Sequence, residues 1–155
     1  MNPAPTALTA LDALAGAMAP LRTHPWAYPA LEVVHIVGIA LLLGNLVLLE
    51  LRVWGYGRHL PVRDLARLSL TVALGGFALA AVSGLLMFAT QAAELLTDRA
   101  FTLKMILLFL AASNAAWFHA RDSLLRLDGV TRFQSVLSMT IWFLVIVCGR
   151  AIAYV

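Results

Sequence analysis

The sequence predicts an all-α integral membrane protein: an up-down four-helix bundle with a short interfacial helix at its N-terminus. Hydrophobic residues make up 62% of the 155 residues and charged residues 12%, against about half and about a quarter in soluble domains. Four apolar runs are each long enough to cross a bilayer. They lack the alternation of lipid-facing strands, so helices must satisfy their backbone amides. We therefore expect one membrane domain over residues 1–155, which excludes a soluble enzyme and a disulfide-stapled secreted module.

The first expected element is an amphipathic helix over residues 6–19. Apolar side chains recur there at helical spacing: Leu8, Leu11, Leu14 and Met18. Asp12 is the charge within this stretch, and a helix of this composition lies in the membrane interface. Docking onto a partner subunit is the alternative. Three prolines then separate this helix from the first span: Pro20, Pro25 and Pro29.

Transmembrane helices follow over residues 31–51, 68–90, 100–120 and 133–155. Each reaches the roughly 20 residues that cover about 30 Å of hydrocarbon in helical form. The connections between them are short, so consecutive spans are expected to be antiparallel neighbours.

The distribution of basic residues predicts the orientation. The loops after the first and third spans carry seven arginines: Arg52, Arg58, Arg63, Arg67, Arg121, Arg126 and Arg132. The opposite side carries fewer basic residues: Arg22, Arg99, Lys104 and Arg150. The positive-inside rule then places both termini outside, which is the periplasm if the cell is Gram-negative. The net charge of +3 is spread over short segments, so no nucleic-acid partner is expected.

With this topology, polar and sulfur-bearing side chains gather in the outer half of the bundle. They are Glu32, His35, Met87, Lys104, Met105, Cys148 and Arg150. An ionisable side chain inside a bilayer is costly, so each is expected to have a partner or a function. His35 is the candidate ligand, because neutral imidazole binds haem iron and copper, and Glu32 lies three residues away on the same helix face. The alternative is a structural histidine bonded to Glu32, to a backbone carbonyl or to Arg150 through water.

Two cofactors are compatible with this outer cluster. For haem b within one chain, the iron would be bound either by His35 and His24, or by His35 alone with a non-histidine or open sixth position. The propionates would pair with basic residues: Lys104, Arg150 and Arg22. A copper ion would take nitrogen and soft sulfur ligands, from the set His35, His24, Met87, Met105 and Cys148. His119 is expected at the opposite face, so it cannot share an iron with His35. A bis-histidine site between protomers is the other route to a six-coordinate haem.

The polar residues of the inner half are interpreted as structural: Asn45, Glu50, Asn114, His119, Gln134 and Ser138. Asn45 and Asn114 are expected to form an interhelical amide pair, and Glu50 an interfacial ion pair with Arg52. The sequence contains no recognisable nucleophile with a base, phosphate-binding loop or zinc-ligand spacing. Hydrolysis and nucleotide chemistry are therefore unsupported, and the question of an enzymatic activity stays open.

Three motifs carry a resemblance to a known family: Glu32-x-x-His35-x-x-Gly38, Phe101-x-x-Lys104 with Asn114 further on, and Gly149-Arg150-x-Ile152-Ala153-Tyr154. Over nearly its whole length the chain resembles an uncharacterised family of four-helix bacterial inner-membrane proteins. More loosely, it looks like the membrane domain of copper-resistance D proteins, which are implicated in copper movement. The resemblance implies a four-helix membrane fold and importance for five residues: Glu32, His35, Lys104, Asn114 and Arg150. The chain departs from di-haem four-helix cytochromes b, which need several histidine ligands on facing helices.

The sequence therefore predicts a haem-b-binding electron-transfer protein or subunit in the bacterial inner membrane. It would pass electrons between the quinol pool and a redox partner outside. The alternatives are a copper-binding or copper-transporting membrane protein, and a cofactor-free assembly or anchor subunit. The lipid bilayer is a partner in all three cases. Each of them is compatible with a homo-oligomer or with a subunit of a larger membrane complex.

Overall fold

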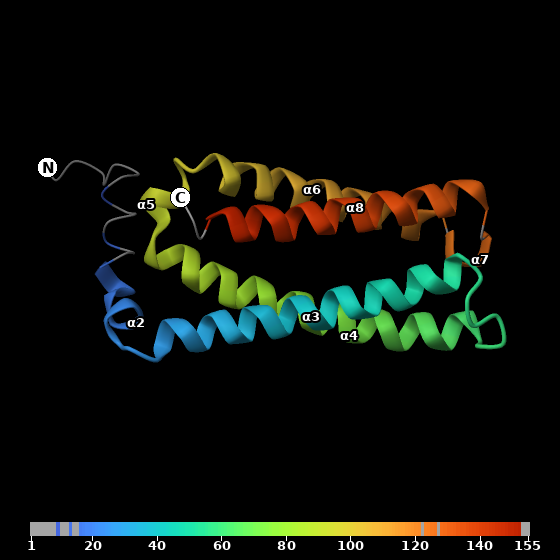
Figure 1. The fold of residues 1–155 in the computed structure, drawn as a ribbon, viewed down its shortest axis with the longest axis horizontal. Coiled ribbons are helices and arrows are strands. Elements are labelled where there is room, and N and C mark those ends of the chain that lie inside the picture. Colours follow the sequence, from blue (N-terminus) through green and yellow to red (C-terminus); the bar gives the residue numbers. More distant parts are fainter. Residues whose placement is uncertain (1–8, 10–12, 14–15, 122, 127, 153–155) are drawn as a thin grey trace, which may run out of the picture.

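The computed structural model describes residues 9, 13, 16–121, 123–126 and 128–152. Within these ranges the structure is helical and contains no strand. The long helices there are α3 (Ala27–Val53), α4 (Val62–Thr90), α6 (Arg99–Ala120) and α8 (Gly129–Ile152). Short helices connect or precede them: α2 (Ala19–Thr23), α5 (Ala92–Leu95) and α7 (Ser123–Arg126). Each long helix is long and apolar enough to cross a membrane, so the predicted all-α membrane bundle is confirmed (Figure 1).

The helices extend beyond the apolar runs that predict them. α3 begins at Ala27, α4 at Val62 and α8 at Gly129, several residues before the predicted starts. Hydropathy marks the hydrocarbon core, whereas a helix continues through the interface until a cap or a turn ends it. The predicted interfacial helix over residues 6–19 falls for the most part outside the described residues.

Local sequence signals end and begin the long helices. After α3, Gly55 and Gly57 adopt positive φ angles of 95° and 60°, which glycine accepts without a steric penalty. The Asp98 carboxylate caps α6 by accepting from the Ala100 amide at 2.6 Å, a favourable arrangement at a helix N-terminus. These turns make the successive long helices antiparallel.

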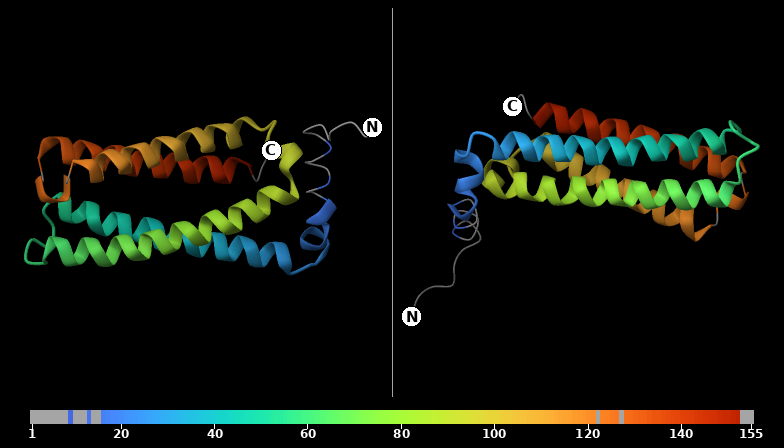
Figure 2. Two further views of the ribbon diagram at one scale, coloured as in Figure 1. Left: turned by 180° about the vertical axis from the view of Figure 1, so that it is seen from behind. Right: turned by 90° about the horizontal axis from the view of Figure 1, so that it is seen from below.

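The bundle consists of two helical hairpins. α3 packs along α4, and α6 packs along α8, whereas contacts between the hairpins are fewer and involve α3 and α8. Figures 1 and 2 show the hairpins side by side. We call the two ends of the molecule the α5 end, where α3 starts and α4 ends, and the α7 end, where the α3–α4 loop lies.

Glycine and alanine bring the backbones of α3 and α4 into contact. A Cβ atom added at Gly38 would lie 2.6 Å from the Ala80 amide nitrogen and 2.7 Å from the Gly76 carbonyl oxygen. Small residues at helix crossings are typical of membrane proteins, where close backbone packing replaces the hydrophobic effect as the driving force. The α6–α8 hairpin instead has a side-chain core: Leu107, Ala111, Ile141, Val145 and Cys148.

The outward surfaces of the long helices are apolar. Phe109 is 72% exposed and Phe143 is 65% exposed, as are many leucine and valine side chains on the other helices. A soluble protein rarely exposes so much contiguous apolar surface, whereas a lipid bilayer solvates it. The protein is therefore a multi-pass membrane protein.

Candidate functional site

His35 lies on the face of α3 that packs against α4. Its Nδ1 atom is 2.8 Å from the Ala80 carbonyl oxygen and 3.1 Å from Ser83 Oγ. A carbonyl oxygen can only accept, so Nδ1 carries the proton and donates it to Ala80. In the neutral ring this tautomer leaves the lone pair on Nε2 available. A backbone carbonyl that fixes a histidine in this way is the usual support for a metal-ligating imidazole.

Small residues on α4 make room for the imidazole. A Cβ atom on Gly84 would lie 3.1 Å from His35 Cε1, so a larger residue at this position would press on the ring. The Ser83 hydroxyl donates to the Leu79 carbonyl at 2.6 Å and therefore presents a lone pair to the ring. The histidine is thus bonded to a backbone carbonyl, which is one of the structural alternatives that the sequence left open.

Lys104 brings a positive charge from the other hairpin to this site. Its side chain is half-buried on α6, and its Nζ atom is 3.6 Å from the position that a Cβ on Gly149 would occupy. It lies within electrostatic range of both His35 and the buried Cys148 thiol. Within the described ranges the ion pair that forms is Arg121–Asp128, at the far end of the bundle. The ammonium of Lys104 therefore has no anionic partner among the described side chains.

The other predicted site residues differ in their exposure. Glu32 and Arg150 are exposed, and Met105 is 49% exposed on α6. His24 is exposed before α3, where its Nδ1 atom accepts from the Trp26 amide at 3.3 Å. Met87 is half-buried on α4. Among the described residues, no three histidine, cysteine or acidic side chains form a group that could hold a metal ion.

Two predicted pairings in the inner half are wrong. Asn45 donates to the Leu41 carbonyl of its own helix at 2.8 Å, whereas Asn114 donates to the Gln134 carbonyl on α8 at 3.1 Å. These asparagines belong to different hairpins, and each donates to a backbone carbonyl within its own hairpin. The expected Glu50–Arg52 ion pair is also absent from the described structure, because residues two apart on a helix point in different directions.

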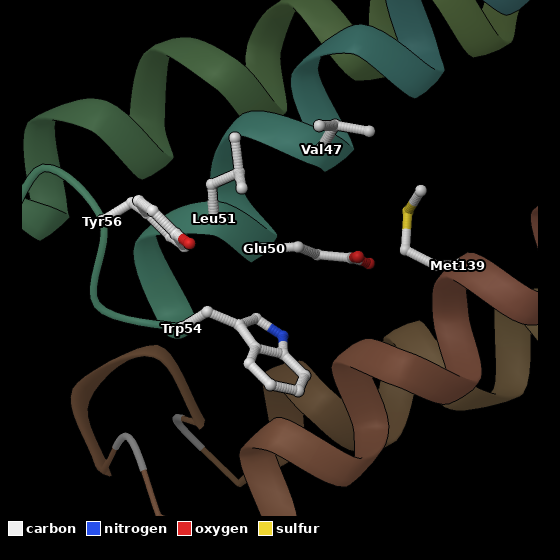
Figure 3. A pocket seen from close by; sticks show the side chains of 6 residues that line it. All are labelled: Val47, Glu50, Leu51, Trp54, Tyr56 and Met139. Atoms are coloured by element: carbon white, nitrogen blue, oxygen red, sulfur yellow. The ribbon is translucent and has the colours of Figure 1, made fainter.

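Glu50 faces α8 and borders a cavity that the sequence did not reveal. The Ser138 side chain lies close to its carboxylate. The cavity has a volume of about 300 Å³ and is lined by Val47, Glu50, Leu51, Trp54, Tyr56 and Met139 (Figure 3). The available sequence signal was the four-residue spacing of Glu50 and Trp54, which places both on one helix face.

A buried polar layer stabilises the α7 end of the second hairpin. The Ser123 hydroxyl donates to Gln134 Oε1 at 3.0 Å, and the Thr131 hydroxyl contacts the Ser123 carbonyl at 3.2 Å. Thr131 and Gln134 are fully buried. These bonds hold α7 against the start of α8, which supports a structural interpretation of this part of the inner cluster.

Comparisons of the chain with models of known protein families, with curated proteins and with solved structures found no match. The function must therefore be inferred from the site itself.

Proposed function

We propose that this membrane protein binds haem b at the α5 end of the bundle and transfers electrons. The observation that supports this most directly is the combination of His35 and Lys104. The imidazole has its Nδ1 proton bonded to the Ala80 carbonyl, which leaves Nε2 for iron. The ammonium comes from the opposite hairpin and lacks a described anionic partner.

The charge of Lys104 favours haem over a copper ion. A cation inside the bilayer repels another cation, and the repulsion is stronger in a low dielectric than in water. Haem b carries two propionates, which would satisfy the ammonium while His35 binds the iron. Met105, one of the expected sulfur ligands, is 49% exposed, and among the described residues no three histidine, cysteine or acidic side chains form a group that could hold a metal ion.

The described residues are compatible with a haem that has one ligand from the bundle. His35 would be that ligand, and Lys104 would pair with a propionate. His24 is exposed before α3 and is the nearest histidine in sequence that could provide a second nitrogen. When bound, the haem supplies one-electron redox chemistry, whereas the protein supplies the iron ligand, a compensating charge and an apolar environment.

We place the protein in the bacterial inner membrane with the α5 end outside. Arginines are concentrated at the α7 end: Arg52, Arg58, Arg63, Arg67, Arg121, Arg126 and Arg132. Short basic loops stay in the cytoplasm. The haem would then lie near the outer surface, where it could exchange electrons with an external partner, and quinol in the lipid would be the donor.

Visible spectroscopy of the purified protein tests the haem proposal. We expect a Soret band and a reduced-minus-oxidised α band after expression with adequate haem supply. His35→Ala should remove both bands, since it removes the iron ligand. Lys104→Gln should weaken haem retention about tenfold, the loss expected for one charge-assisted bond.

His119→Ala is the matched control, because His119 is exposed at the far end of α6. Its spectrum should equal that of the unaltered protein. An unaltered protein without a Soret band, or a His35→Ala variant that keeps the full spectrum, would overturn the proposal and leave a cofactor-free membrane subunit.

A further inference from the structure

Glu50 is an uncompensated carboxylate near the α7 end. It lies in the last turns of α3 and is half-buried. The nearest arginine in sequence, Arg52, donates instead to the carbonyl oxygens of Leu60 and Arg58, each at 3.4 Å. Arg58 itself donates to the Gly55 carbonyl at 3.2 Å. In the described part of the chain these bonds hold the local cations on the loop, and no ion pair neutralises Glu50.

Aromatic rings and apolar side chains surround this carboxylate. Figure 3 shows Glu50 extending from α3 toward Met139 on α8, with the Trp54 indole and Tyr56 on the loop side. The Trp54 indole N–H donates to Ser135 Oγ at 3.3 Å, which fixes the ring between the hairpins. Val47 and Leu51 complete the lining.

This combination of groups recognises one class of ligand. A carboxylate attracts cations, and the faces of tryptophan and tyrosine attract them as well. The apolar walls favour a cation that carries hydrocarbon over a hydrated metal ion. A metal ion would also need further acidic, histidine or cysteine ligands, and the described residues offer no such group.

We infer that the Glu50 cavity binds the ammonium group of an amphiphilic organic cation. The volume of about 300 Å³ is at the lower end of the range for small-molecule sites, so it suits an ammonium group and a short apolar part. The cavity lies in the last turns of α3, where the apolar run that predicts the first span ends. The ligand is therefore either the amine headgroup of a phospholipid or a soluble lipophilic ammonium ion. This site is independent of the haem proposal.

Calorimetric titration of the full chain in a neutral maltoside detergent tests this inference. The probe is benzyltrimethylammonium, and phenylmethanesulfonate is the anionic control of similar size. We expect the cation to bind and the anion not to bind. Glu50→Gln should weaken the cation at least about tenfold, and Trp54→Leu about threefold, because they remove the charge contact and the cation–π contact.

Glu32→Gln is the matched control variant, since it removes an exposed carboxylate from the other end of the same helix. Its affinity for the cation should equal that of the unaltered protein. Equal binding of cation and anion, no binding of the cation, or equal effects of Glu50→Gln and Glu32→Gln would overturn the inference. If Glu50→Gln does not fold, the two probes on the unaltered protein and the Trp54→Leu variant decide the question.

A lipid arm of the experiment distinguishes the two sources of the ammonium group. The titration is repeated in phosphatidylglycerol nanodiscs with and without phosphatidylethanolamine. Loss of probe binding when phosphatidylethanolamine is present identifies the lipid headgroup as the ligand. Unchanged binding identifies a soluble lipophilic cation. The haem spectrum of Glu50→Gln should equal that of the unaltered protein. The spectrum therefore tests the haem proposal and the titration tests the cation site, each independently of the other.

Discussion

At the scale of single residues, hydrogen bonds to backbone carbonyls determine what the polar side chains can do. The Ala80 carbonyl oxygen 2.8 Å from His35 Nδ1 fixes one tautomer of the imidazole. The Leu41 carbonyl oxygen 2.8 Å from Asn45 keeps that amide on its own helix. In both cases the partner is a main-chain atom whose position depends on the rotation of a helix. Such partners cannot be identified from residue types alone.

Asp128 provides a pH-dependent contribution to stability outside the membrane. Its carboxylate accepts from the Thr131 amide and the Thr131 hydroxyl, both at 2.8 Å. These two hydrogen bonds, with a smaller contribution from Arg121 at 3.1 Å, lower the pKa of Asp128. A lowered pKa in the folded state stabilises the protein above the unfolded pKa of about 3.9, and this contribution is lost as pH falls through the folded value.

We therefore expect acid to lower the melting temperature of the unaltered protein more than that of Asp128→Asn. The asparagine can still accept from the Thr131 amide, but it cannot lose a charge. Circular dichroism melts from neutral pH down to about pH 3 would measure the difference. Asp64→Asn, on an exposed residue of α4, is the control and should follow the unaltered protein. Parallel curves for all three proteins would contradict the role of Asp128.

At the scale of the elements, the sequence predicts the long helices well and their contacts poorly. Hydropathy is a bulk property, so the apolar runs locate α3, α4, α6 and α8 to within a few residues. The rotation of each helix is harder to predict, because lipid-facing and interior faces are both apolar and periodicity is weak. For this reason the sequence predicts an ion pair between Glu50 and Arg52, whereas Glu50 points toward α8 in the structure.

The close packing of α3 against α4 leads to a prediction about glycine substitutions. Gly38→Ala should destabilise the protein by roughly 1–3 kcal/mol, the usual cost of overpacking, because the new Cβ would meet the Ala80 backbone nitrogen at 2.6 Å. Gly44→Ala on the same helix has no atom within 4 Å of the new Cβ. It should be neutral or stabilising by up to about 1 kcal/mol, as alanine favours helix.

Unfolding in mixed detergent micelles, followed by the loss of helical circular dichroism, would measure both variants. Equal shifts in the two midpoints would show that α3 and α4 do not pack through their glycines. The same comparison can be made on α4, where Gly76 contacts Gly38 and Leu42 of α3 but Gly75 faces open space.

At the scale of the whole molecule, the candidate site was predicted in part. The sequence placed His35 and Lys104 at one depth, since both lie near the same end of antiparallel helices, and the structure brings them within electrostatic range. It also grouped Glu32 and Arg150 with them, yet both are exposed. The depth of a residue in the membrane follows from its position along the helix. To belong to the site, its side chain must also lie on the helix face that points into the bundle.

Orientation in the membrane gives a prediction for the whole molecule. In a Cys148→Ser background, which removes the only cysteine, we expect Thr97→Cys to react with an impermeant thiol reagent on intact spheroplasts. His59→Cys should react only after lysis, because its loop is rich in arginine. Both positions are exposed, between α5 and α6 and between α3 and α4 respectively. The reverse pattern of labelling would place the α7 end outside.

Both proposed sites contain residues from both hairpins, and this has a practical consequence. The proposed haem site combines α3 with α6, and the Glu50 cavity combines α3 with α8, so an occupant of either one bridges the two halves of the fold. A molecule that binds only the assembled form raises its stability in proportion to the logarithm of its concentration. Compound libraries, lipids and porphyrins can thus be screened by the increase they cause in the melting temperature of the protein. This screen needs no assay of activity.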